Sequence, residues 1–131
     1  MTGRRPADGF TLVEMMIVMI MIGILVSIAL PNYRTARLQA REAVLKEDLF
    51  RFRDLIDQYY ADKGKYPATL ESLVEDGYLR RMPVDPMTGS ADWEAVPEEP
   101  DPNNPGQDLG VFDVKSASTA QSLGGTPYNE W

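Results

Sequence analysis

The chain has 131 residues and a formal net charge of −7, and it contains neither cysteine nor histidine. Disulfides and thiolate metal sites are therefore excluded, and the commonest general base and metal ligand is missing, so we expect no enzyme. The acidic balance also argues against a nucleic-acid partner, because nucleic acids select basic surfaces.

An apolar run begins close to the N-terminus. Phe10 to Leu30 contains one charged residue, Glu14, and has the length of about 20 residues that a helix needs to cross the hydrocarbon core of a membrane. Arg4 and Arg5 precede the run. Because positive charge is retained on the cytoplasmic side, we expect a single-pass protein with its N-terminus inside and the rest of the chain outside.

Three interpretations fit this run. A cleaved secretory signal peptide has an apolar core of only about 7–15 residues and then a small-residue cleavage site, and SIALPNY is a poor site of that kind. An ordinary membrane anchor explains the length but not Glu14, since an acidic residue at the centre of a membrane helix costs about 2.5–3.5 kcal/mol. The third interpretation places a cleavage between Gly9 and Phe10.

The third interpretation rests on a resemblance. The stretch GFTLVEMMIVMIMIGILVSIALPNY, which starts at Gly9, resembles the N-termini of type IV pilins and type II secretion pseudopilins. The resemblance implies that a prepilin peptidase cleaves after Gly9 and that Phe10 is then N-methylated. It also implies that Glu14 sets the assembly register by pairing with the new amine on a neighbouring subunit, because a buried carboxylate needs a cation. The alternative is an interfacial glutamate without a partner.

Gly23 and Pro31 are the two positions that weaken the predicted long helix, since proline removes a backbone donor and clashes with the preceding turn. The resemblance implies that the segment between them is partly unwound in an assembled filament. The alternative is an intact helix with a kink at Pro31.

Beyond Pro31 the chain is polar but keeps a helical period. Apolar residues recur at spacings of three and four, which places them on one face of a helix. Gly64, followed by Pro67, marks the end of the pattern. We predict one helix from about Thr11 to Asp62 whose second half packs against a small domain. The predicted stripe and its margin are Leu38, Leu45, Leu49, Phe52, Leu55, Ile56, Tyr59 and Tyr60.

The remaining chain predicts short elements joined by turns. We expect a helix over 69–75, capped by Thr69 or Ser72, and strands over 91–96 and 109–116 that pair antiparallel. Alternation in the second strand predicts that Phe112 and Val114 face the core. Tyr78 and Leu79 are expected to dock against the long helix, and Tyr128 and Trp131 to fold back on the domain as anchors.

These elements predict an α+β, pilin-like fold. A long N-terminal α-helix, hydrophobic in its first half and amphipathic in its second, packs against a small antiparallel β-sheet. The predicted divisions are a leader over 1–9, a transmembrane or filament-core helix over 10–31 and a globular domain over 32–131. Within the domain, 32–63 is the amphipathic helix and 64–131 holds the loops and the sheet.

The segment EEPDPNNPGQD, residues 98–108, is acidic and rich in proline, and we expect a solvated loop. Its oxygen donors Glu98, Glu99, Asp101 and Asp108 are of the type that calcium prefers. The resemblance implies one calcium held by aspartates after the last long strand, but SASTAQSLGGTPYNEW contains no aspartate. We therefore expect no cofactor, with calcium in the acidic loop as the alternative.

A second landmark narrows the resemblance. The path from Tyr66-Pro67 to MPVDPMTG is similar to that of major pseudopilins, the G subunits of type II secretion, although Met87 stands where tryptophan is usual. This implies a structural subunit in the inner membrane with a periplasmic domain. An inner-membrane assembly platform and minor pseudopilins would help it to form a homo-oligomeric helical filament that drives protein export across the outer membrane.

Two other functions are open on these residues. The first is the major pilin of a type IV pilus, used for adhesion, motility or DNA uptake. The second is a membrane-anchored acidic binding module or small enzyme, which would work without cleavage at Gly9.

Overall fold

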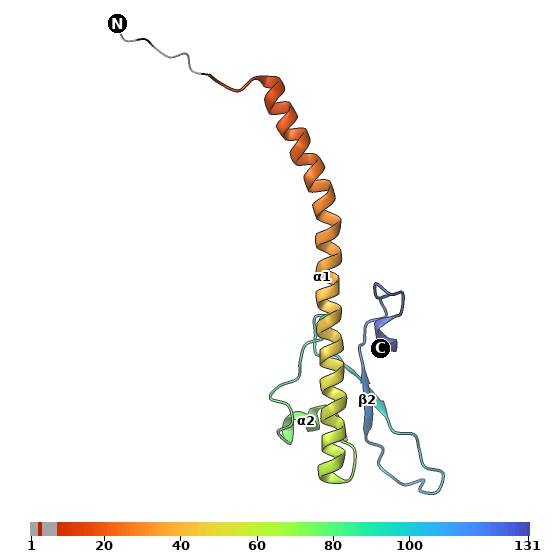
Figure 1. Cartoon of the computed structure of the whole chain (residues 1–131). Helices are drawn as coiled ribbons and strands as arrows, with labels where there is room; N and C mark the ends of the chain where they lie inside the picture. Colours follow the sequence, from red (N-terminus) through yellow and green to blue (C-terminus); the bar gives the residue numbers. More distant parts are fainter. Residues whose placement is uncertain (1–2, 4–7) are drawn as a thin grey trace. The chain divides into compact units, whose positions relative to one another are not determined.

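The computed structural model describes Gly3 and residues 8–131. The chain divides into two compact units, Met1–Arg37 and Leu38–Trp131. The predicted α+β, pilin-like architecture is confirmed, with the small elements lying beside the C-terminal half of the long helix (Figure 1). In chain order the elements are α1 (Leu12–Lys63), α2 (Glu71–Glu75), β1 (Glu94–Pro97), β2 (Val111–Lys115) and a short 3-10 helix, η1 (Tyr128–Glu130).

Helix α1 begins and ends within one residue of its predicted bounds. Its C-terminus is closed by Gly64, which has φ +72° and donates its N–H to the carbonyl of Tyr60 at 2.8 Å. A residue with a Cβ would be strained in this left-handed conformation, so glycine is the natural stop. Lys63, in the last turn, adds a favourable charge at the negative end of the helix dipole.

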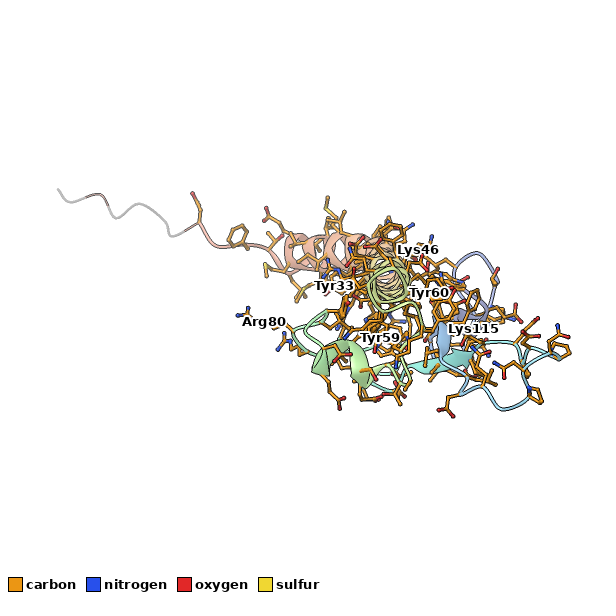
Figure 2. All side chains as sticks on the ribbon, turned by 90° about the horizontal axis from the view of Figure 1, so that it is seen from below. Tyr33, Lys46, Tyr59, Tyr60, Arg80 and Lys115 are labelled. Atoms are coloured by element: carbon orange, nitrogen blue, oxygen red, sulfur yellow. The ribbon has the colours of Figure 1, made fainter. Side chains whose placement is uncertain are left out.

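The predicted stripe forms the core of the Leu38–Trp131 unit. Viewed along the helix, Tyr59 points toward α2 and the strands, whereas Lys46 lies on another side of α1 (Figure 2). Leu38 and Leu55 are half-buried and Tyr60 is exposed, so they lie at the margin. The buried residues that α1 contributes are Leu45, Leu49, Phe52, Ile56 and Tyr59, and the rest of the chain adds Leu70, Leu73, Trp93, Val111, Val114 and Tyr128.

The sheet contains one correction to the sequence analysis. β1 and β2 pair antiparallel as predicted, with Ala95 opposite Val114, but the register shifts between Val96 and Pro97. Val96 is opposite Asp113 and Pro97 is opposite Val111, so Phe112 is the extra residue of a bulge. The bulge reverses the alternation: Val111 is buried and Phe112 is 55% exposed. The prediction that Phe112 faces the core is therefore wrong, whereas that for Val114 is confirmed.

Three shorter elements start later than predicted, and β2 is one of them, since it begins at Val111 and not at 109. α2 begins at Glu71 and not at 69, and its N-cap Leu70 makes no side-chain cap. The hydroxyls of Thr69 and Ser72 instead lie 3.3 Å apart, within hydrogen-bonding distance of each other. β1 starts at Glu94 because Trp93 turns into the core, where its indole N–H donates to the carbonyl of Pro83 at 2.8 Å.

Asp85 explains why the chain turns where the sequence reads DP. This residue is fully buried, and its carboxylate accepts hydrogen bonds from the Met87 N–H at 2.8 Å and from the Ser116 hydroxyl at 2.5 Å. The Gly89 N–H donates to its carbonyl at 2.8 Å. A buried carboxylate is tolerated here because its hydrogen bonds compensate for the loss of water. Asp85 thereby ties the turn to the end of β2.

Candidate functional site

The predicted cleavage site lies just before α1. Gly9 and Phe10 are outside regular secondary structure and exposed, and the Phe10 side chain is 80% exposed. A Cβ added to Gly9 would meet nothing within 4 Å, so nothing in the described part of the chain shields this bond. Arg4 and Arg5 of the predicted leader lie outside the described residues.

Glu14 occupies the first turn of α1. Its backbone N–H donates to the hydroxyl of Thr11 at 3.2 Å, which makes Thr11 the cap of the helix. Thr11 and Glu14 thus have the T-x-x-E spacing of a capping box, and the carboxylate lies at the positive end of the helix dipole. The capping role of Thr11 was not predicted, although its spacing to Glu14 is present in FTLVE. Thr11 is therefore the residue that caps α1, and the carboxylate of Glu14 adds a favourable charge in the first turn, besides its predicted task in assembly.

The apolar half of α1 finds no cover within its own unit. Every residue from 10 to 30 is exposed, including large side chains such as Leu25 at 67% and Met19 at 66%. Among the described residues, α1 is the one helix long and apolar enough to cross a membrane. Water would not tolerate such a surface, because burying a large aliphatic side chain is worth about 1.5–3 kcal/mol. A bilayer or other protein must therefore cover it.

Gly23 and Pro31 both lie inside α1, which is continuous through them. Because Pro31 has no N–H, the carbonyl one turn earlier, that of Ser27, lacks its helical donor. The hydroxyls of Ser27 and Thr35 donate to the carbonyls of Ile24 at 2.7 Å and Pro31 at 3.1 Å. Unwinding between Gly23 and Pro31 concerns the assembled filament and stays a prediction.

The acidic loop does not gather its carboxylates. Glu98 accepts a hydrogen bond from the Gly110 N–H at 3.0 Å, and Asp101 accepts one from the Asn103 N–H at 2.8 Å. Both carboxylates thus fold the loop, while Glu99 and Asp108 are exposed. Across the described residues, no three His, Cys, Asp or Glu side chains lie where they could share a metal ion.

The segment after β2 is held to α1 by side chains. Glu42 accepts hydrogen bonds from the Leu123 N–H and from the hydroxyl of Tyr128, both at 2.8 Å. The Arg53 guanidinium donates to the main-chain oxygen of Trp131 at 2.8 Å and pairs with Asp113, also at 2.8 Å. These contacts pin residues 116–131 to the helix at two levels.

Two tyrosine hydroxyls titrate far above their ordinary range. Burial, reinforced by the hydrogen bond to Glu42, raises the pKa of Tyr128 to about 12. The hydrogen bond to Asp62 is the main cause that raises the pKa of Tyr78, also to about 12. In both cases a neighbouring carboxylate favours the neutral hydroxyl, which can donate, over the phenolate, which cannot. Both tyrosines therefore serve as hydrogen-bond donors at neutral pH.

The comparisons with known proteins agree with this geometry. The family described as the prokaryotic N-terminal methylation motif matches residues 4–30. Type II secretion system core protein G of Escherichia coli K12 is 33% identical over 132 residues, covering 88% of this chain and 84% of the relative.

Two further relatives carry the same name. The protein from Klebsiella michiganensis is 32% identical over 130 residues, covering 87% of this chain and 84% of the relative. The protein from Pseudomonas aeruginosa is 36% identical over 99 residues, covering 63% of this chain and 70% of the relative. No solved structure matches. The methylation motif at the N-terminus and the identity along the chain lead to one conclusion: the chain belongs to the type II secretion system core protein G family, the major pseudopilins.

Proposed function

We propose that this pseudopilin is cleaved by prepilin peptidase after Gly9, N-methylated at Phe10 and polymerised into a periplasmic filament. Growth of the filament drives protein export across the outer membrane. Before assembly, residues 10–31 anchor the subunit in the inner membrane. An inner-membrane assembly platform adds subunits, and minor pseudopilins join them. The chain acts mechanically and performs no chemistry of its own.

One observation carries this proposal. The apolar half of α1 is exposed along its whole length, while the second half of the same helix already has a core in its own domain. A segment of this kind needs a bilayer in the free subunit and can exchange it for the apolar halves of other subunits. That exchange is favourable when packing between helices replaces lipid contacts.

Glu14 sets the register between neighbouring subunits when they pack. In the membrane, a carboxylate near one end of the segment lies close to the interface, where its cost is low. When subunits pack, it loses this access to water and needs a cation and hydrogen bonds. The amine created at Phe10 by cleavage after Gly9 is such a cation. Cleavage and assembly are thus linked, because an uncleaved chain lacks the partner for Glu14.

Two substitutions of Glu14 separate the role of its charge in assembly from the role of residue 14 in starting α1. Glu14→Gln keeps a residue suited to the third helical position, so α1 still starts at Leu12, but it removes the charge. We expect Glu14→Gln to enter the membrane normally and to lower the yield of filaments recovered from disrupted cells by about tenfold or more. Glu14→Asp, which keeps the charge on a shorter side chain, should retain part of the yield. A Glu14→Gln chain that assembles like the wild type would show that assembly does not need the charge of Glu14.

The cellular function is tested by deletion. Removing the gene should abolish export of secreted proteins while any surface pili remain, and the wild-type chain should restore export. Lost piliation with normal secretion would contradict the proposal and favour a type IV pilus subunit.

A further inference from the structure

The resemblance to major pseudopilins implies a calcium ion near the C-terminus, but the donors of this chain do not fit one. From Ser116 to Trp131 the only acidic residue is Glu130. Calcium takes six to eight oxygen ligands and relies on carboxylates among them. The described residues also place no group of three carboxylates together elsewhere. Something other than a metal must therefore hold the segment over 116–131.

α1 supplies the replacement. Glu42, Lys46 and Arg53 all reach the C-terminal segment, and we call their contacts with residues 116–131 the C-terminal clasp. Glu42 receives hydrogen bonds from the Leu123 N–H and the Tyr128 hydroxyl. The ammonium of Lys46 lies 5.0 Å from the ring centre of Trp131, within the range of a cation–π contact.

Arg53 completes the clasp, and contacts outside it hold the two ends of the segment. Arg53 donates to the main-chain oxygen of Trp131 at 2.8 Å and also reaches the Val114 carbonyl at 3.3 Å. At the start of the segment, Ser116 is fully buried and bonds to Asp85 at 2.5 Å. The tyrosine at the far end, Tyr128, is 2% exposed and stacks edge-on against Trp131 with ring centres 5.2 Å apart. The hydrogen bonds of Glu42 and Arg53 involve a charged group, and such bonds are stronger than those between neutral groups.

We propose that the C-terminal clasp does in this chain what a bound calcium would do, so that the domain folds and keeps its C-terminal segment in place without any metal. The carboxylate of Glu42 accepts two hydrogen bonds from donors in the segment, whereas a calcium ion would bind oxygen atoms. The inference concerns the folded subunit and does not depend on filament assembly.

Proteolysis of the full chain in detergent micelles tests the proposal. Lysine-specific cleavage after Lys115, within β2, releases residues 116–131 when the segment opens. We expect the wild-type release rate to be equal in 1 mM calcium chloride and in 1 mM EDTA, within about twofold. Glu42→Ala should raise the rate by about fivefold or more and lower the Tm by about 5–10 °C, because it removes two charged hydrogen bonds.

The matched control is Glu47→Ala, which removes a carboxylate of the same helix that is exposed and pairs with Arg51. It should leave the release rate unchanged. Calcium should not slow release from the Glu42→Ala chain. The proposal is overturned if EDTA speeds release from the wild type, if calcium slows it, or if Glu42→Ala behaves like the control. Export measured in parallel keeps the test of filament function separate.

Discussion

The two halves of α1 form one continuous helix, but only the second half is buried by the chain itself. Residues 10–30 are exposed throughout, whereas five residues between Leu45 and Tyr59 are buried by the chain's own domain. The first half is apolar on every face, and the second is apolar along one stripe. The second half of the helix is therefore covered by its own domain, whereas the first half needs a cover from outside the chain. A subunit built in this way can be stable alone and still require partners.

The largest expected effect contrasts the two halves directly. Phe52→Ala removes a side chain that is 1% exposed and packs edge-on against Trp93, so it should lower the free energy of unfolding by about 3–5 kcal/mol. Ile20→Ala, at a position that is 59% exposed, should change it by less than about 0.5 kcal/mol. Chemical unfolding of the full chain in detergent micelles measures both. Equal losses would mean that the first half also has a core within the chain.

A smaller effect tests the bulge in β2. Val114→Ala should cost about 1.5–3 kcal/mol, because Val114 is fully buried. Phe112→Ser should cost less than about 1 kcal/mol, since the side chain is exposed and packs edge-on against the ring of Tyr66, with ring centres 5.6 Å apart. The same unfolding assay applies. A reversed order would restore the regular alternation that the sequence alone predicts.

The smallest effect concerns pH in the second half. Because the pKa of Tyr128 and of Tyr78 is raised to about 12 from 10.0, their contribution to stability is fully present below pH 10. It is lost as pH rises from 10 toward 12, since the unfolded chain gives up these protons first. The Tm should fall across this window, and Tyr128→Phe should reduce the fall. A Tm that stays flat between pH 10 and 12 would contradict the described hydrogen bonds to Glu42 and Asp62.

The long helix and its stripe could be predicted because both are local. Spacings of three and four determine which residues share a face, and Gly64 supplies the stop. The pairing of the two strands also followed from pattern and turns. The register of the pairing could not be predicted in this way. One extra residue in β2 reverses which side chains point inward, and nothing in the sequence near Phe112 indicates it.

The C-terminal clasp could not be predicted for a different reason, which is that its contacts join distant parts of the sequence. The bonds from Leu123 and Tyr128 to Glu42 join residues 81 and 86 positions apart. Glu42 is one of many charged residues on the polar faces of α1, so its sequence context does not distinguish it. By contrast, the capping role of Thr11 could have been predicted from the T-x-x-E spacing.

We propose that the N-terminal stretch joins a cleavage signal to an assembly signal. Intact mass measurement of the chain purified from membranes of cells that contain the prepilin peptidase tests it most directly. We expect a mature chain that begins at N-methylated Phe10 and lacks residues 1–9. A functional chain that still begins at Met1 would contradict it.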